Sequence, residues 1–284
     1  MIQIKKLVLF LSSFLILGVA THTNADEIYN STYDNTALNH PTQYEKGWAR
    51  NFILDIKHDF TGYMKSDNLL LLGDTFIVAG VLANTGLDRS FANHWQTDIR
   101  NSTVNHILEV PCHAGSLSIY YLPLYLGTMG LGHLREHTGI GNTVYHWGYR
   151  SLRTFILGGL QQVILTNLIG SGRPNKNEDS KWQPFKYQTG VSGHAFYGAI
   201  PFLTAAMMSD PPLLRYGLYA FSVLPGVSRI NSNRHYLSQV ILGWGLAYLS
   251  ARTVYNSDLE RSPTFRVNVY PRSDGAMLAA HLQF

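Results

Sequence analysis

Three short stretches in the second half of the chain hold residue types that suit phosphate chemistry. They are Gly172-Arg173-Pro174, Val191-Ser192-Gly193-His194, and the segment 228–235, which begins Ser228-Arg229 and ends Arg234-His235. Arginine donates paired, charge-assisted hydrogen bonds to phosphate oxygens. Histidine titrates near neutral pH, so one histidine can attack phosphorus while another protonates the leaving oxygen. Such a set can transfer a phosphoryl group by positioning and electrostatics, and needs no metal.

The second stretch also has the features of a helix start. Ser192 suits the position before a helix, where its hydroxyl accepts a backbone N–H. Gly193 lets the backbone approach a ligand closely, and the apolar run 195–200 follows it. The free N–H groups and positive dipole end of a helix attract an anion. The three stretches together therefore predict a site for one phosphate group.

The order and spacing of these residues resemble the type 2 phosphatidic acid phosphatase superfamily, which includes class A acid phosphatases and vanadium haloperoxidases. The family pattern is Lys, six residues, Arg-Pro; then Pro-Ser-Gly-His; then Ser-Arg, five residues, His, three residues, Asp. The pieces in register with it are Arg173-Pro174, Ser192-Gly193-His194, Ser228-Arg229 and His235. The resemblance covers residues 166–239 and implies an all-α fold with a single helical-bundle domain.

The resemblance implies a role for each matching residue. His235 is the implied nucleophile, which forms a phosphohistidine, and His194 is the implied general acid. The implied phosphate-binding residues are Arg173, Ser192, Gly193 and Arg229. No metal and no cofactor is expected. The implied enzyme is a phosphoric monoester hydrolase that acts on a phosphomonoester or pyrophosphate of a lipid or small molecule.

Three positions depart from the family pattern. Thr166 replaces Lys and removes a cation, and Val191 replaces Pro. Gln239 replaces the Asp that pairs with the nucleophile; we count it as catalytic because its amide oxygen can still accept the N–H of His235. Loss of the carboxylate in a comparable triad lowers the rate by about 10⁴-fold. We expect a working phosphatase, with a catalytically weakened phosphate- or lipid-binding relative as the alternative and a haloperoxidase as a more remote one.

The substrate is left open by the sequence. Phosphatidic acid, phosphatidylglycerophosphate, polyprenyl pyrophosphate, lipid A phosphates and nucleotides are all chemically allowed. The polar segment 175–190 is expected to form a loop over the phosphate site and to shape the choice among them.

One other string has the spacing of metal ligands. Residues 133–137, His-Leu-Arg-Glu-His, match the H-x-x-E-H pattern of inverted zinc proteases. A pattern this short arises easily in a chain with 12 histidines, and Thr138-Gly139 ends that helix early. We interpret the string as a polar helix end. Inhibition by EDTA is the observation that would favour a protease instead.

The N-terminus and the charge of the chain bear on its location and partners. Lys5 and Lys6, the apolar stretch 7–19 and Thr23-Asn24-Ala25 predict a signal peptide over residues 1–25, so we expect export to the periplasm. Without this segment the net charge falls from +4 to +2, with 20 Lys and Arg against 18 Asp and Glu, and no basic stripe is visible, so nucleic-acid binding is not expected. Cys112 is the single cysteine, which excludes an internal disulfide.

Hydrophobic spacing predicts the elements that carry these residues. Helices are predicted over 46–64, 68–85, 145–170, 193–208, 213–223 and 235–254, with another ending near Pro111 within 89–113. Alternation over 265–269 and 277–284, around a turn at 271–275, predicts a β-hairpin. We therefore expect a signal peptide at 1–25, a helical phosphatase domain at 26–262 and a hairpin tail at 263–284.

Several uncharged runs are long enough to span a membrane. Their Gly, Thr, Gln and Asn content and the mean hydropathy of −0.04 favour instead a periplasmic helical domain, with contact to a membrane surface left open. The expected partners are a phosphorylated lipid or small-molecule substrate and that membrane surface.

Overall fold

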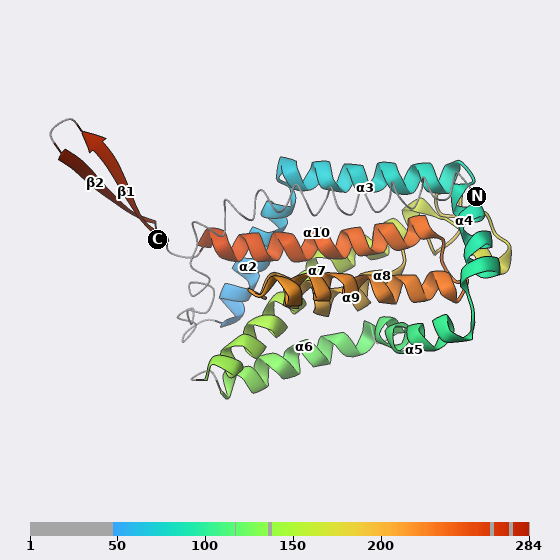
Figure 1. Ribbon diagram of the computed structural model, residues 1–284, viewed down its shortest axis with the longest axis horizontal. Helices are drawn as coiled ribbons and strands as arrows, with labels where there is room; N and C mark the ends of the chain where they lie inside the picture. Colours follow the sequence, from blue (N-terminus) through green and yellow to red (C-terminus); the bar gives the residue numbers. More distant parts are fainter. Residues whose placement is uncertain (1–47, 117, 136–137, 262–263, 273–274, 284) are drawn as a thin grey trace. The chain divides into compact units, whose positions relative to one another are not determined.

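The computed structural model describes residues 48–116, 118–135, 138–261, 264–272 and 275–283. The chain divides into a helical unit that runs to Glu260 and a second unit that contains the C-terminal hairpin. The helices are α2 (Trp48–Tyr63), α3 (Ser66–Asn84), α4 (Leu87–His94), α5 (Ser102–Ser116), α6 (Ser118–His133), α7 (Gly139–Ile169), α8 (Gly193–Met207), α9 (Pro212–Asn231) and α10 (Leu237–Arg261). A π-helical turn, η2 (Trp95–Ile99), precedes α5, and a 3-10 turn, η3 (Pro174–Lys176), follows α7. Figure 1 shows the order of these elements.

Helix α8 lies at the centre of the helical unit. It is apolar all round, which is the pattern of a buried helix. Phe196, Ile200 and Leu203 are completely buried and belong to the same core as Tyr125 of α6 and Leu246 of α10. Helices α5, α7 and α9 pack against α8 as well. The all-α helical bundle is therefore as predicted, and its core surrounds the helix that follows Ser192.

The predicted helices over 46–64, 68–85, 145–170 and 193–208 are confirmed as α2, α3, α7 and α8, with small shifts at their ends. The ends of α3 and α7 do differ in detail. Helix α3 begins at Ser66, two residues before the predicted start, and Lys65 is at its cap position. Gly170 adopts the left-handed conformation that ends α7, with a φ of 61°.

Helices α5, α6 and α9 each contain a proline in their interior. Pro111 lies inside α5, Pro123 inside α6 and Pro225 inside α9, so α9 continues well beyond the predicted 213–223. A proline in a helix interior costs about 3 kcal/mol. Packing of these helices in the bundle offsets that cost, because most helical stability comes from tertiary contacts. The helix predicted within 89–113 to end near Pro111 continues to Ser116, and α4 and η2 precede it.

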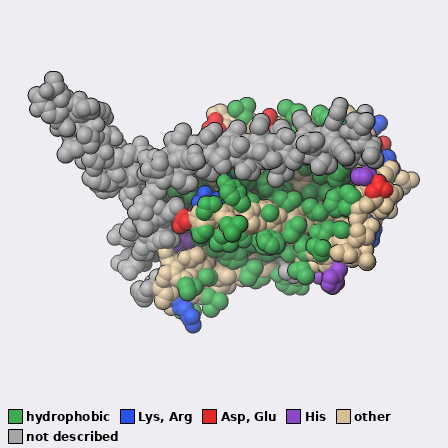
Figure 2. Space-filling model, viewed as in Figure 1, with side chains coloured by type: hydrophobic (Ala, Val, Ile, Leu, Met, Phe, Trp, Pro, Cys, Tyr) green, Lys and Arg blue, Asp and Glu red, His purple; other side chains and the backbone are tan. Residues whose placement is uncertain are grey.

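The surface of the helical unit exposes many large apolar side chains. Figure 2 shows hydrophobic side chains gathered over the middle of the visible face. Helix α3 and the segment Gly139–Lys176, which contains α7, are long and apolar enough to cross a membrane by length and composition. In the apolar window of α3 only 22% of the residues are buried, and Leu70, Ile77 and Val81 are at least half exposed. These features are consistent with membrane association.

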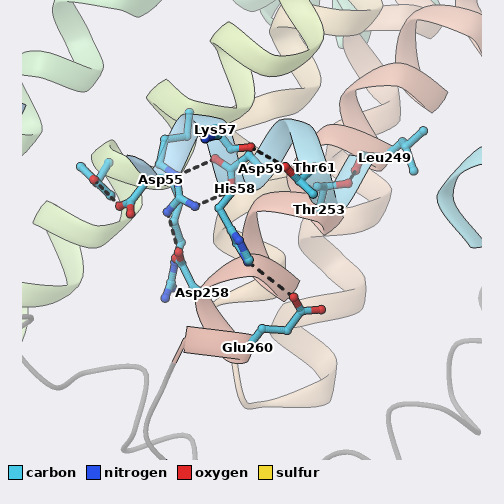
Figure 3. Close-up of polar contacts among 12 residues, drawn as sticks. Asp55, Lys57, His58, Asp59, Thr61, Leu249, Thr253, Asp258 and Glu260 are labelled. Carbon is cyan, nitrogen blue, oxygen red and sulfur yellow. Dashed lines mark hydrogen bonds and ion pairs between the residues drawn. The ribbon is translucent and has the colours of Figure 1, made fainter. Parts of the chain in front are cut away.

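A buried ion network joins α2, α7 and α10 far from the start of α10. Arg153 is completely buried and donates through Nε and Nη2 to Asp59 at 2.8 and 2.6 Å. Its Nη1 reaches Asp258, which also accepts from Arg150 at 2.8 Å. Figure 3 shows Asp59 and Asp258 at this junction. Because removal of one partner from a buried ion pair costs about 3–5 kcal/mol, this network fixes α2 onto the other two helices.

The C-terminal unit contains a two-stranded antiparallel hairpin. Strand β1 (Thr264–Arg272) pairs with β2 (Gly275–Gln283), and the register opposes Thr264 to Gln283 and Arg272 to Gly275. The strands fall where alternation predicted them. The predicted signal peptide at 1–25 lies outside the described residues.

Candidate active site at the helix ends

Four helix termini meet at one end of the helical unit. Helix α7 ends and α8 and α10 begin there, and α9 reaches its last turn. The backbone N–H of Ser192 donates to the carbonyl of Gln239 at 2.9 Å, and that of Gly190 donates to Thr166 at 3.1 Å. A Cβ atom on Gly243 of α10 would lie 2.4 Å from the Ser192 carbonyl oxygen, so only glycine allows α10 to pack this closely. The three sequence stretches are therefore brought to one place.

His235 lies in the turn before α10, although the sequence predicted it to be the first residue of that helix. Its Nδ1 is 2.7 Å from Oε1 of Gln239. The same Oε1 accepts the backbone N–H of Tyr236 at 3.2 Å, while Nε2 of Gln239 donates to the Gly172 carbonyl at 2.6 Å and to Ser171 Oγ at 2.8 Å. A backbone N–H can only donate and a carbonyl can only accept, so the amide has one possible orientation. His235 must therefore carry its proton on Nδ1, which leaves Nε2 with a free lone pair.

His194, in the first turn of α8, contacts the end of α5. Its Nε2 is 3.0 Å from Oγ of Ser116, whose hydroxyl donates to the carbonyl of Cys112 at 3.0 Å. A Cβ atom on Gly115 would lie 2.9 Å from Cβ of His194, so α5 packs directly against this residue. Because the Ser116 proton is used toward Cys112, its oxygen is left to accept, and Nε2 of His194 carries the proton.

The two arginines of the site have unused donors. The guanidinium of Arg229 contacts Cys112 through Nη1 and Sγ at 3.6 Å, and its Nε is buried with no hydrogen-bond partner among the described residues. Within the same part of the chain, no carboxylate forms an ion pair with Arg173 or Arg229. A buried donor without a partner is costly, which makes an anionic ligand favourable here.

Both imidazoles are neutral at ordinary pH. Burial lowers the pKa of His235 to about 3 against the opposing hydrogen bond to Gln239, and the charges of Arg229, Arg173 and His194 lower it further. Burial also lowers the pKa of His194 to about 4, with added effects of Arg229 and Arg173. The two arginines act on both histidines, so the four side chains share one electrostatic environment.

Ser192 and Gly193 form the start of α8 as predicted. Ser192 is completely buried, and its Oγ accepts the N–H of Ala195 at 3.4 Å as a helix cap. A Cβ atom on Gly193 would make only ordinary contacts, the nearest 3.6 Å from Nε2 of Gln162. Protein packing therefore does not demand glycine at residue 193, and its small size leaves room beside the first turn of α8.

Thr166 stands where the resemblance leads one to expect a lysine. Its hydroxyl donates to the carbonyl of Val191 at 3.3 Å and accepts from Gln162 Nε2 at 2.9 Å. Thr166 therefore contributes a hydroxyl that two hydrogen bonds fix in place, and no positive charge.

Two residues of the site were not found from the sequence. Ser116 contacts His194 across 78 residues of sequence, and Asp88 contacts Ser238 across 150. The completely buried Asp88 accepts the backbone N–H of Ser238 at 3.0 Å and also bonds to its hydroxyl, so α4 caps the first turn of α10. Nothing in the local sequence of either residue indicates a partner so far along the chain.

Two residues of the zinc-protease string, 136 and 137, lie outside the described residues. Within the described ranges, no group of three or more His, Cys, Asp or Glu side chains has an arrangement that could hold a metal ion.

Comparisons with known proteins identify a matching family and a similar fold. Residues 149–262 match the sequence model of the PAP2 superfamily. The fold is similar to the crystal structure of a transmembrane PAP2 type phosphatidylglycerolphosphate phosphatase from Bacillus subtilis, with a TM-score of 0.52 and 21% sequence identity. That match covers 68% of this chain and 96% of the Bacillus chain. No curated protein matches this sequence.

Proposed function

We propose, from the match of residues 149–262 to the PAP2 superfamily, that this chain is a phosphatase that uses His235 as its nucleophile. Its proposed substrate is a phosphomonoester or pyrophosphate of a lipid or small molecule. The similarity to a phosphatidylglycerolphosphate phosphatase supports a lipid phosphate among these. The reaction steps below use side chains of this chain alone.

In the first step, Nε2 of His235 attacks phosphorus. The hydrogen bond from Nδ1 to Gln239 at 2.7 Å keeps the proton away from the attacking nitrogen, and the low pKa of about 3 keeps the ring neutral. The N–P bond forms as the bond between phosphorus and the leaving oxygen breaks. Gln239 accepts the N–H of the positive ring that results, but without the charge that a carboxylate would add.

His194 serves as the proton donor and then as the base. With the phosphate bound, the ring, whose Nε2 is 3.0 Å from Ser116, is protonated on both nitrogens, and this imidazolium gives one proton to the leaving oxygen and becomes neutral. The neutral ring then takes a proton from water, which attacks the phosphohistidine and releases phosphate. A bound phosphate offsets the burial and arginine charges that lower the pKa of His194, because a neighbouring anion favours the protonated ring.

Guanidinium and backbone N–H donors of the site hold the phosphate oxygens. Arg229 and Arg173 supply guanidinium groups, and the first turn of α8 supplies backbone N–H groups behind Ser192 and Gly193. The observation that carries the proposal is the convergence of the site segments. The N–H of His235 donates to the carbonyl of Arg229 at 3.3 Å, and α5 contacts both Arg229, through Cys112, and His194, through Ser116.

The test is phosphate release by the purified protein in detergent. We expect His235→Ala and His194→Ala to lower kcat by at least about 10³-fold, with vanadate as an inhibitor and EDTA without effect. His58→Ala is the matched control, since this histidine lies on α2 and pairs with Glu260 at the other end of α10. Equal activity of wild type and both site variants would refute the assignment.

A weakened, phosphate-binding relative is the second candidate, favoured by one observation. Thr166 presents a hydroxyl bonded to Gln162, so the cation that the family places at this position is absent. Such a protein would bind vanadate but release little phosphate, and Thr166→Lys would raise its turnover. Rapid turnover by wild type excludes this candidate.

The proposed location is at a membrane on the periplasmic side. The exposed apolar side chains of α3 and α7 support membrane contact. Export depends on the predicted signal peptide, and N-terminal sequencing of the mature protein would show whether cleavage follows Ala25.

A further inference from the structure

The loop between η3 and α8 exposes an aromatic side chain between two lysines. Its sequence contains the aromatic residues Trp182, Phe185 and Tyr187 together with Lys181 and Lys186. Phe185 is 75% exposed, and both lysines are exposed as well. The reaction steps above use none of these five side chains, so their arrangement needs another explanation.

The backbone of this loop holds Phe185 in a fixed, outward position. The N–H of Phe185 donates to the carbonyl of Asn167 at 2.9 Å, and the N–H of Gln183 donates to that of Ile169 at 3.0 Å. The loop is therefore bonded to carbonyls of the last turn of α7, which have no partner within the helix. Phe185 has a φ of 63°, a left-handed conformation that is unfavourable for a bulky residue. A strained backbone that presents an exposed ring indicates a contact that the described residues do not supply.

The same loop continues the apolar surface of α3. Trp182 lies edge-on to Phe76, with ring centroids 6.1 Å apart, and a Cβ atom on Gly80 would lie 3.2 Å from its ring. The backbone N–H of Trp182 donates to Oδ1 of Asn84, the last residue of α3, at 3.2 Å. The 19 residues of α3 extend about 28 Å, close to the hydrocarbon thickness of a bilayer, about 30 Å. If α3 contacts lipid, Trp182 lies at the level of the headgroups, where tryptophan is enriched.

The charge of the loop selects the kind of surface that it meets. Residues 180–190 contain two cations and no carboxylate, and no described carboxylate forms an ion pair with Lys181 or Lys186. Nζ of Lys186 lies 5.2 Å from the ring centroid of Tyr187 and donates to the neutral amide oxygen of Gln183 at 2.6 Å. Neither contact cancels the charge of the lysine. Lysines beside a membrane are attracted to anionic lipid headgroups.

We propose that this loop is a membrane anchor, in which the ring of Phe185 inserts among the headgroups of an anionic bilayer and Lys181 and Lys186 pair with the negative charges of those headgroups. Lys186 and Tyr187 also line a cavity of about 390 Å³ beside Arg173. The anchored loop therefore holds the Arg173 side of the site at the membrane surface. The inference rests on the proposed location at a membrane and adds which segment meets the lipid and which charge that lipid carries.

A fluorescent label can report whether the loop meets lipid. In the full-length protein with Cys112→Ser, the label is attached at Phe185→Cys, and the protein is reconstituted into phosphatidylcholine vesicles with or without anionic phosphatidylglycerol. We expect the label to be shielded from uncharged acrylamide in the water and to be quenched by a lipid that carries a quencher near its headgroup, more strongly in the anionic vesicles. A label at Asn175→Cys is the matched control, because Asn175 is exposed, polar and part of η3 at the same end of the unit. It should stay open to acrylamide in both kinds of vesicle.

The role of the lysines is tested in the protein labelled at Phe185→Cys. Each lysine near an anionic surface is worth about fivefold in an equilibrium constant, so Lys181→Gln/Lys186→Gln should lower the ratio of inserted to free label in anionic vesicles by about tenfold or more. In phosphatidylcholine alone the ratio should stay within about twofold of the parent protein. Lys57→Gln removes an exposed lysine of α2 instead and should leave the ratio unchanged.

Several outcomes overturn the inference. They are a label at Phe185→Cys as open to acrylamide as the one at Asn175→Cys, equal shielding in neutral and anionic vesicles, and shielding without quenching by the lipid-borne quencher, which would mean that a protein covers the ring. Phosphate release from a water-soluble phosphomonoester, measured on the same samples, tests the phosphatase proposal separately. A shielded label in a protein that releases no phosphate overturns the phosphatase and leaves the anchor, and an open label in an active protein does the reverse.

Discussion

The amide of Gln239 is held by four hydrogen bonds, two to each end. An amide stands here in place of the carboxylate of the family pattern, so the tautomer of His235 depends on how that amide is oriented. When the carboxylate of a comparable triad is replaced by an amide, the histidine adopts the wrong tautomer, and this is a main cause of the large loss of rate. Here the Gly172 carbonyl and the Tyr236 N–H fix the amide so that its oxygen faces His235. The expected penalty is therefore loss of the charge alone, which fits a working enzyme.

Substitutions of Gln239 should distinguish a role of its amide in catalysis from a role in stability. We expect Gln239→Leu to lower kcat by at least about 100-fold with little change in KM, because the tautomer of His235 is no longer fixed. Gln239→Glu should lose stability more at pH 8 than at pH 5, since an ionised carboxylate faces the Gly172 carbonyl and only a protonated one can donate to it. Steady-state kinetics measure kcat and KM of Gln239→Leu, and circular dichroism melting curves at pH 5 and pH 8 measure the stability of Gln239→Glu. Unchanged kcat in Gln239→Leu would contradict the role.

Ser116 should act through His194. Its oxygen accepts from the protonated nitrogen, and a hydrogen bond to the protonated ring raises the pKa of that ring. Ser116→Ala should therefore lower the pKa of His194, shift the alkaline limb of the pH–kcat profile to lower pH and reduce kcat by about tenfold. Ser116→Thr, which keeps the hydroxyl, should restore the profile. A loss of rate with no shift of the limb would show a merely structural role.

The buried histidines also make stability depend on pH. Burial lowers the pKa of His235 to about 3, whereas the unfolded chain has a value of about 6.5, so below that pH the unfolded chain binds more protons. The stability it contributes is present above about pH 6.5 and is lost as the pH falls toward 3. At pH 5 the loss is about 2 kcal/mol, or about 4–8 °C in Tm. Tm measured at about pH 7 and pH 5 should fall less in His235→Gln than in wild type, and parallel falls would contradict this origin.

At the scale of elements, the site is made where helices end. The turn before α10 carries the proposed nucleophile His235, the first turn of α8 carries the proposed proton donor His194, and the last turns of α9 carry Arg229. Helix α5 supplies both Ser116 and Cys112 from a region whose proline had predicted an earlier end. Small shifts of any of these ends would separate the reacting groups.

Substitution of Asp88 tests whether the site depends on the position of the start of α10. Asp88→Ala removes the cap of α10 and leaves the buried polar groups of Ser238 unpaired, so we expect a loss of about 2–4 kcal/mol in the free energy of unfolding. The activity should fall with it, because His235 lies just before that turn. Asp67→Ala, an exposed acid in the first turn of α3, should change stability by less than about 0.5 kcal/mol. Denaturant titration provides the measurement, and equal losses in the two variants would contradict the cap.

At the scale of the molecule, the helical unit exposes apolar surface whose contact with water is unfavourable. Contact with an apolar partner would therefore stabilise it. Contiguous apolar patches on soluble proteins rarely exceed a few hundred Å². The exposed apolar side chains of α3 alone include Leu69, Leu70, Ile77 and Val81. A membrane surface or interior satisfies these groups, and it would bring the site to a lipid substrate.

Spin labels can test which face meets lipid. In a Cys112→Ser background, a nitroxide at Ile77→Cys should be more accessible to oxygen, which concentrates in lipid, than to a water-soluble nickel complex. The label at Lys57→Cys, an exposed polar position on α2, should show the opposite order. Electron paramagnetic resonance of protein in vesicles measures both accessibilities. Equal nickel accessibility at the two positions would exclude lipid contact by α3.

Part of this protein is determined by its sequence alone. The spacing of Arg173, Ser192, His194, Arg229 and His235 pointed to one phosphate site, and local hydrophobic periodicity placed α2, α3, α7 and α8. Both depend on residues near each other in the chain or on a motif with a fixed order. The helix boundaries at prolines were wrong, because local preference was outweighed by packing in the bundle.

The tertiary structure alone decided which hydrogen bonds connect the residues of the site. The orientation of Gln239 comes from Ser171 and Gly172, which lie 68 and 67 residues earlier, and the partner of His194 comes from a helix 78 residues earlier. A hydrogen bond depends on atoms within about 3 Å of each other, and only packing of the whole helical unit sets such distances between segments far apart in the chain.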